Sequence, residues 1–266
     1  MNESYSLSII FPVLNERKNL EKLIPEFNSY LSETIKNFEF IIVDDNSTDN
    51  TDVFVEELKL KNININYIKR IENNSLPLSI LEGINNSKYS NISWLDADGS
   101  MHLEAFKTIL HTHIQNPTEV VIGSRFITGG GYKGISNLEN SNFLHSIFNV
   151  KKSQDSVLGM ILSNLFNKLL SVFYKSGVKD ITSGFIITNK KYITKDSFLN
   201  CIYGEYFIYL VANFIDQNIN IKEVGYICET RLFGESKTAP NVLVLFKRGV
   251  PYIKAAIKCR RKIVNS

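Results

Sequence analysis

The chain has 266 residues, of which 44% are hydrophobic, and it carries a formal net charge of +3. This length and apolar content suit one large α/β domain or two small ones and exclude a disordered chain. The basic excess is too small to indicate nucleic-acid binding. Its three cysteines lie far apart and fit neither a disulfide framework nor a zinc site, so we expect free thiols in the cytoplasm.

Short apolar runs alternate with helix-like segments through the first half of the chain. Between the first two runs, Leu20, Leu23, Ile24, Phe27 and Leu31 recur every three or four residues, which is typical of the buried stripe of a helix. The runs have the length of buried strands and cover residues 7–11, 38–43, 63–68, 91–95 and 120–123. The alternation predicts a mostly parallel, Rossmann-like sheet flanked by helices on both faces.

The second half is less regular. A polar segment over 132–155 reads as a loop over a site, and a helical stripe returns over 156–174. Strands are predicted over 185–188 and 221–225, with a helix over 206–215 between them. No linker divides the chain, so we expect a single α/β domain over 1–238 followed by a tail over 239–266.

Polar residues directly follow four of the apolar runs. Because ligands bind at the carboxyl ends of strands in a parallel sheet, these residues are the first candidates for a site. They are Asn15 and Glu16 after the first run, Asp44, Asp45 and Ser47 after the second, Asp96 and Asp98 after the fourth, and Arg125 after the fifth.

Asp96 and Asp98 are separated by one residue at a strand end. Two such carboxylates can reach one hard cation, Mg²⁺ or Mn²⁺, which would stabilise a diphosphate leaving group. The same Asp-Ala-Asp-Gly sequence also suits an ordinary turn. Asp44 and Asp45 similarly read either as a loop that caps the next helix or as acceptors for a base or ribose.

Two further segments place cations near the expected site. Arg125 is either a surface residue or a phosphate ligand at the ligand edge of the sheet. The segment over 231–237 sets Arg231 and Lys237 around a flexible glycine, so it is either a solvated loop or a loop that closes over a diphosphate.

Six segments, in this order, resemble the family 2 glycosyltransferases with the GT-A fold, and within them the dolichol-phosphate mannose synthase-like branch. The similarity extends over about residues 7 to 238. The segments are 11–17 (Phe-Pro-Val-Leu-Asn-Glu-Arg), 42–49 (Ile-Val-Asp-Asp-Asn-Ser-Thr-Asp), 95–98 (Leu-Asp-Ala-Asp), 123–126 (Gly-Ser-Arg-Phe) with Gly129 and Gly130, 178–185 (Val-Lys-Asp-Ile-Thr-Ser-Gly-Phe) and 231–237 (Arg-Leu-Phe-Gly-Glu-Ser-Lys).

The resemblance implies an inverting glycosyltransferase that moves a sugar from a UDP- or GDP-linked donor to a polyprenyl phosphate or a growing cell-surface glycan. It implies Mg²⁺ or Mn²⁺ as cofactor, held by Asp96 and Asp98, with Ser100 as a further metal or phosphate contact. Four residues would act on the reacting groups: Asp98, Arg125, Arg231 and Lys237. The nucleotide-sugar pocket would be formed by Pro12, Leu14, Asn15, Glu16, Asp44, Asp45, Ser47, Asp96 and Ser236.

Departures from the family pattern gather on the acceptor side. Ile186 stands where the family usually has an arginine, the third loop reads Ser75-Leu76-Pro77 in place of a Gly-Leu-Gly turn, and an arginine expected near 156–163 has no counterpart. The acceptor therefore stays open. Glu205 is either a base for a hydroxyl acceptor or an exposed acid at a helix start.

Two other functions remain as alternatives. A nucleotidyltransferase usually has a glycine-rich loop after the first strand, whereas this chain has residues 12–16, Pro-Val-Leu-Asn-Glu. A nucleotide-sugar-binding protein without transfer activity would fit the missing cations.

The tail after Pro240 mixes apolar residues with a basic cluster. It either lies on an anionic membrane surface or packs on the domain as an ordinary helix. No run reaches the roughly 18 residues of a membrane span, and the chain starts unlike a signal sequence. We therefore expect a cytoplasmic protein that is either soluble or peripheral, with contact between its tail and the inner face of the cell membrane as one of the two alternatives.

Overall fold

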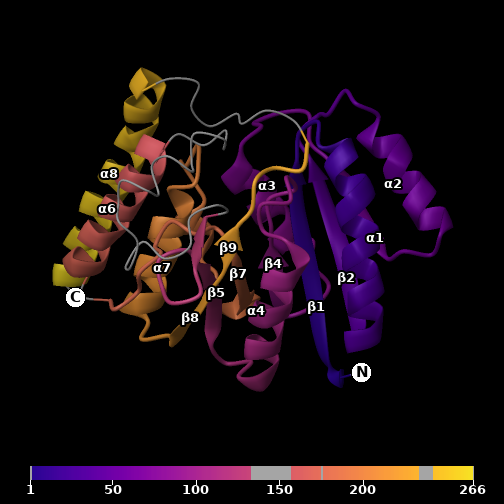
Figure 1. Ribbon diagram of the computed structural model, residues 1–266, viewed down its shortest axis with the longest axis horizontal. Helices are drawn as coiled ribbons and strands as arrows, with labels where there is room; N and C mark the ends of the chain where they lie inside the picture. The colour runs from indigo at the N-terminus through magenta and orange to yellow at the C-terminus, as the bar shows by residue number, and fades with distance from the viewer. Residues whose placement is uncertain (1, 133–156, 175, 234–241, 266) are drawn as a thin grey trace.

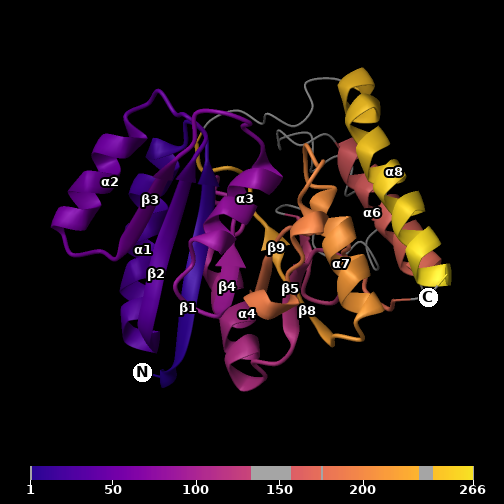
Figure 2. The same cartoon turned by 180° about the vertical axis from the view of Figure 1, so that it is seen from behind.

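The computed structural model describes residues 2–132, 157–174, 176–233 and 242–265. They form an α/β domain in which a central sheet has helices on both faces (Figure 1, Figure 2). This confirms the predicted fold class. The polar segment expected as a loop over a site lies, apart from Tyr132, outside the described residues.

The sheet has seven strands in the order β3-β2-β1-β4-β7-β5-β8. All neighbouring pairs are parallel except those of β7, which runs antiparallel to β4 and β5. Its strands are β1 (Asn2–Val13), β2 (Ile35–Asp44), β3 (Ile65–Lys69), β4 (Asn91–Trp94), β5 (Val120–Ser124), β7 (Ile186–Asn189) and β8 (Ile221–Gly225). A separate ribbon pairs β6 (Gly131–Tyr132) with β9 (Ile227–Cys228).

Helices divide between the two faces because the strands alternate between two cores. Phe11 packs in the core with α1, α2 and α4, whereas its neighbour Ile10 packs in the core with α3, α6, α7 and α8. The helices are α1 (Arg17–Thr34), α2 (Thr51–Leu60), α3 (Leu76–Asn85), α4 (Leu103–Gln115), α6 (Val157–Tyr174), α7 (Tyr206–Asp216) and α8 (Val242–Asn265), with two 3₁₀ turns, η1 (Lys190–Tyr192) and η2 (Lys195–Ser197).

The segment read as a third loop is the start of α3. Ser75 is its N-cap and accepts a hydrogen bond from the backbone N–H of Leu78, and Pro77 lies in the first turn. Proline is tolerated there because the first backbone N–H groups of a helix have no intrahelical partner. An N-cap serine and a proline in the first turn of α3 therefore stand where the family pattern has a Gly-Leu-Gly turn.

α6 and α8 lie side by side at one end of the sheet and run in the same direction (Figure 1, Figure 2). Near the middle of both helices Phe166 packs edge-on against Tyr252, and further along Tyr174 donates a hydrogen bond to the carbonyl of Ala256 at 2.9 Å. The tail thus packs on the domain through one of its faces. No helix in the described parts of the chain is long and apolar enough to span a bilayer.

A buried pair ties the start of β1 to α4. The Tyr5 hydroxyl lies 2.6 Å from His113 Nδ1, and both side chains are buried. Burial lowers the pKa of His113 to about 4 because the charged imidazolium would lose its hydration. His113 is therefore neutral in the folded protein at neutral pH.

Replacing His113 by Gln is expected to flatten the pH dependence of the free energy of unfolding between pH 6.5 and about 4. In this window the unfolded chain takes up a proton that the folded chain does not, so the native protein loses stability as the pH falls. The loss amounts to roughly 3 kcal/mol at the acid end. Urea denaturation at several pH values measures it, with exposed His111→Gln as the matched control; an unchanged slope in His113→Gln contradicts the assignment.

Candidate functional site at the carboxyl edge of the sheet

The loops after β1 and β2 are joined by hydrogen bonds. The backbone N–H of Asn15 donates to Ser47 Oγ at 2.8 Å, and that of Thr48 donates to Asn15 Oδ1 at 2.8 Å. Asn15 has a φ of 57°, in the left-handed region that asparagine tolerates. Both predicted residues, Asn15 and Ser47, therefore use their side chains to shape the edge.

Asp44 has a similar role. Its Oδ1 accepts the backbone N–H of Ser47 at 2.7 Å, and its Oδ2 accepts the Tyr67 hydroxyl at 2.6 Å. The carboxylate is buried and closes the turn after β2. On the neighbouring β1, Pro12 is half-buried, whereas Leu14 is exposed beyond the strand end. Pro12 and Leu14 thus leave apolar surface beside this turn.

Asp45 is paired with an arginine that the sequence analysis missed. Arg70 Nη1 lies 2.7 Å from Asp45 Oδ1, and the same nitrogen donates to the Ser79 hydroxyl. Burial raises the pKa of Asp45, and the hydrogen bond from Ser79 and the charge of Arg70 offset part of that rise. Arg70 directly follows β3, so the rule that selected the other strand ends also applies to it.

Asp96, Asp98, Glu16 and Arg231 come together at the ends of β1 and β4. Arg231 Nη2 lies 3.0 Å from Asp98 Oδ2, and its Nη1 lies 3.6 Å from Glu16 Oε1. The Asp98 Oδ1 atom accepts the backbone N–H of Ser100 at 2.9 Å. Three of the predicted acids and one predicted cation therefore form one cluster.

The Asp96 carboxylate is repelled by the other negative charges of this cluster. Solvent reaches its side chain, but protein atoms crowd around it and reduce its hydration. This crowding, together with the negative charges of Asp98 and then Glu16, raises its pKa above the usual range, while Arg231 offsets part of the rise. A further positive charge beside Asp96 would relieve the repulsion.

These carboxylates suit a divalent cation whose remaining ligands are substrate phosphates and waters. In the described parts of the chain, no three Asp, Glu, His or Cys side chains gather into a preformed metal site. Mg²⁺ is commonly held by one or two carboxylates together with substrate phosphates and waters. Asp96 and Asp98 match that pattern.

Residues on either side of Arg231 are hydrogen-bonded to the Asp96–Asp98 turn and to Ser100 after it. The backbone N–H of Glu229 donates to the Ser100 carbonyl at 3.0 Å, and that of Leu232 donates to the Asp98 carbonyl at 3.0 Å. The Leu232 side chain lies so close to Gly99 that a Cβ at position 99 would approach it to 2.6 Å. Two other predicted residues, Ser236 and Lys237, lie outside the described residues.

Arg125 is held at the end of β5 by an ion pair with Asp180. Its Nε and Nη2 donate to the two carboxylate oxygens of Asp180, both at 2.8 Å, and Nη2 also donates to the Thr182 carbonyl at 3.1 Å. The backbone N–H of Arg125 donates to Asp180 as well. Arg125 therefore fixes the 180–182 loop. The sequence did not indicate this role.

Glu205 is neither an exposed acid nor a side chain open to a substrate. It is buried, and its two carboxylate oxygens accept the backbone N–H groups of Ile202 and Tyr203, both at 2.8 Å. Ile186, at the position of the missing arginine, is fully buried in β7. A cation there would lie inside the sheet core.

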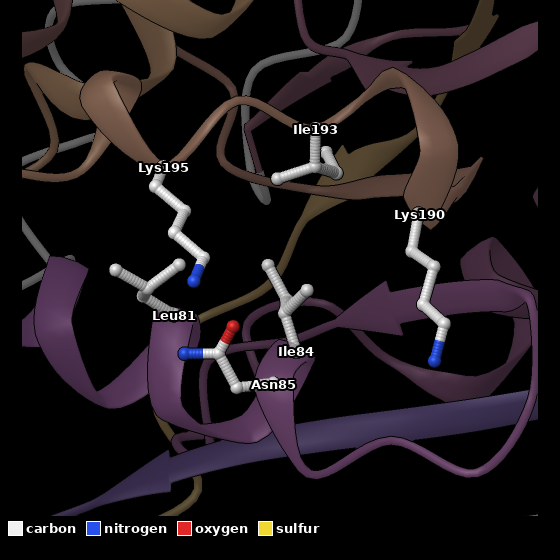
Figure 3. Close-up of a pocket in the computed structure, with 6 residues that line it drawn as sticks. All are labelled: Leu81, Ile84, Asn85, Lys190, Ile193 and Lys195. Carbon is white, nitrogen blue, oxygen red and sulfur yellow. The ribbon is translucent and has the colours of Figure 1, made fainter.

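A cavity of about 250 Å³ lies at the opposite edge of the sheet (Figure 3). Lys190 beside it follows the end of β7 that pairs with the start of β4, and its Nζ donates to the Ser87 carbonyl at 2.8 Å. The cavity is lined by Leu81, Ile84, Asn85, Lys190, Ile193 and Lys195. It is separate from the strand-end cluster.

Comparison with known proteins was consistent with this arrangement. The model of the family described as Glycosyl transferase family 2 matches residues 8–195. Dolichol-phosphate mannosyltransferase from Pyrococcus furiosus is 31% identical over 124 residues, which cover 47% of this chain and 34% of that protein. Poly(ribitol-phosphate) beta-N-acetylglucosaminyltransferase TarP from Staphylococcus aureus is 28% identical over 218 residues, which cover 78% of this chain and 63% of that protein. The matches thus span less than two thirds of either relative.

Solved structures with the same fold include glucosyl-3-phosphoglycerate synthase from Mycobacterium tuberculosis in complex with Mn²⁺, UDP and glucosyl-3-phosphoglycerate. The TM-score is 0.60 at 14% sequence identity, with 96% of this chain and 79% of that chain covered. At this identity the likeness concerns the fold.

Replacing Asp180 by Ala is expected to lower the free energy of unfolding by about 3–5 kcal/mol, because Arg125 would be left in the interior without its counter-ion. The double variant Arg125→Met/Asp180→Leu removes both charges and is expected to lose less. Urea denaturation measures both. Glu104→Ala, which breaks an exposed pair with Lys107, is the control and should lower the free energy of unfolding by under about 1 kcal/mol. If Asp180→Ala lowers it by no more than this control, the Asp180–Arg125 pair does not stabilise the fold as assigned.

Proposed function

The chain belongs to glycosyl transferase family 2, and from that premise we propose that it moves a sugar from a UDP- or GDP-linked donor to a polyprenyl phosphate or a growing cell-surface glycan. The transfer would invert the anomeric configuration. The observation that carries the proposal is the cluster of Asp96, Asp98, Glu16 and Arg231 at the ends of β1 and β4.

The nucleotide would bind over the ends of β1 and β2. Pro12 and Leu14 offer apolar surface there, and Asp45 offers a carboxylate that Arg70 holds in place. Asn15, Asp44 and Ser47 lock the two loops and so fix the pocket's shape. This rigid floor would orient the base and ribose without reorganisation on binding.

The diphosphate would bind at the Asp96–Asp98 turn. Bound Mg²⁺ or Mn²⁺ would neutralise the charge that develops on the diphosphate as the glycosidic bond breaks. Asp96 and Asp98 would hold that ion, and Arg231 would turn from Asp98 to the phosphate oxygens. Ser236 and Lys237 follow in the same segment and would add donors to the phosphates.

Glu205, the residue considered as a base for a hydroxyl acceptor, is engaged within the protein. A hydroxyl acceptor needs a base within reach, and the oxygens of Glu205 are occupied by two backbone N–H groups. The oxygen of a phosphate monoester is already anionic, so it can attack without a base. The name of the Pyrococcus furiosus relative points to a lipid phosphate, whereas that of TarP points to a polymer, and both acceptors belong in the test.

Calorimetry with UDP and GDP tests the donor side. Binding of one nucleotide should depend on Mn²⁺ and weaken at least about tenfold in Asp98→Ala, because one carboxylate ligand is lost. Glu104→Ala should bind like the wild type. Failure of both nucleotides to bind with Mn²⁺ would refute the proposal.

Transfer assays test the acceptor side. A short polyprenyl phosphate and a glycan with free hydroxyl groups should be offered in separate reactions with the donor that binds. Product in the polyprenyl phosphate reaction is expected. Nucleotide binding without transfer to either acceptor would indicate a binding protein, and pyrophosphate release from a nucleoside triphosphate would indicate a nucleotidyltransferase.

Arg231→Gln is expected to have opposite effects on two affinities. The affinity for Mn²⁺ alone should rise severalfold, because the guanidinium that neutralises Asp98 at 3.0 Å competes with the ion. The affinity for UDP or GDP in the presence of Mn²⁺ should fall, because a phosphate contact is lost. Titration of Mn²⁺ followed by electron paramagnetic resonance measures the first effect, with Arg17→Gln, from an exposed pair on α1, as the control. Unchanged Mn²⁺ affinity would show that Arg231 does not compete.

A further inference from the structure

One face of the molecule, which we call the α6–α8 face, exposes apolar side chains on both helices. On α6 these side chains recur every three or four residues, and Val172 is 79% exposed. The apolar members are Leu165, Leu169, Val172 and Phe173 of α6 with Val250, Ile253 and Ile257 of α8. Exposed apolar side chains in this number on adjacent helices mark an interaction surface.

The two helices also contact each other at the surface, beside their apolar stripes. The Arg260 guanidinium of α8 lies 4.1 Å above the Phe173 ring of α6, where both side chains reach the surface. On the opposite flank of α8, Lys258 lies 5.6 Å from the Tyr209 ring of α7. The apolar residues of α8 thus lie on the flank that faces α6, and exposed lysines border them.

Charge on the molecule is distributed very unevenly. The whole chain has 30 basic and 27 acidic residues, and α6 and α8 together contain eight of the basic residues and none of the acidic ones. The rest of the chain therefore has 22 basic against 27 acidic residues, a net charge of −5. The α6–α8 face carries the positive end of an otherwise acidic molecule, and its exposed described cations include Lys168, Lys254, Lys258 and Arg260.

We propose that the α6–α8 face docks on an anionic lipid bilayer, with α6 and α8 both lying in the plane of the interface. Helices at a bilayer surface combine an apolar face that enters the acyl boundary with basic residues that attract anionic headgroups. The α6–α8 face has both, and a surface made by two parallel helices buries more apolar area than the tail alone. The inference goes beyond the proposed function, since docking requires neither donor nor metal.

A second copy of the chain fits this face less well. In a two-fold dimer the same patch would meet itself, so the positive charges of α6 and α8 would face their own copies without any acidic residue from these helices. Like charges facing each other across an interface are strongly unfavourable. An anionic surface supplies the opposite charge.

Sedimentation of the full chain with vesicles tests the proposal in the presence of a chelator and without nucleotide. The protein should bind vesicles containing phosphatidylglycerol and bind vesicles of phosphatidylcholine alone much more weakly. Lys254→Gln/Lys258→Gln should lower the partition coefficient about fivefold per charge, and added salt should lower it too. Val172→Asp/Ile253→Asp should remove most of the binding.

Leu60→Asp is the matched control, because Leu60 is 84% exposed on α2 at the other end of the sheet (Figure 1). It should bind vesicles like the wild type, and all variants should keep the wild-type affinity for nucleotide in solution. Absence of vesicle binding, equal binding to neutral vesicles, or equal loss in Leu60→Asp would overturn the proposal. A wild-type dimer that Val172→Asp/Ile253→Asp converts to monomer, with no vesicle binding, would assign the face to a second copy.

Discussion

Burial of the sheet on both faces confines its polar side chains largely to the edges. Along β1, Phe11 packs in the core beneath α1 and α4, and Ile10 packs in the core beneath α3 and α7. An ionised side chain on either face would have to leave water and would need a buried partner. Side chains that bind charged ligands therefore follow the last apolar residue of a strand, and the parallel strands bring these positions to one edge.

At that edge, acids and arginines occur as pairs. Arg70 is paired with Asp45, Arg125 with Asp180, and Arg231 with both Asp98 and Glu16. The first two pairs are joined to surrounding loops by further hydrogen bonds and act as fixed parts of the scaffold. Arg231 makes no such second set of bonds in the described residues, so it is the arginine whose partner can change.

The strands and their order of occurrence could be predicted from sequence because a buried parallel strand is a short, continuous apolar run. Its neighbours in the sheet could not, and the antiparallel insertion of β7 between β4 and β5 depends on contacts between distant segments. In the site, positions at strand ends were predictable, but the direction of a side chain was not. Arg125 points to Asp180, which lies 55 residues later, and no local pattern carries that information.

The uneven charge of α6 and α8 has a consequence for orientation. These helices lie at one end of the sheet, and the net negative charge belongs to the remainder of the chain, so the molecule has a permanent electric dipole along its long axis (Figure 1). In the field of an anionic surface this dipole experiences a torque. Within about 10 Å, the screening distance at moderate salt, this torque would rotate the molecule until α6 and α8 lead.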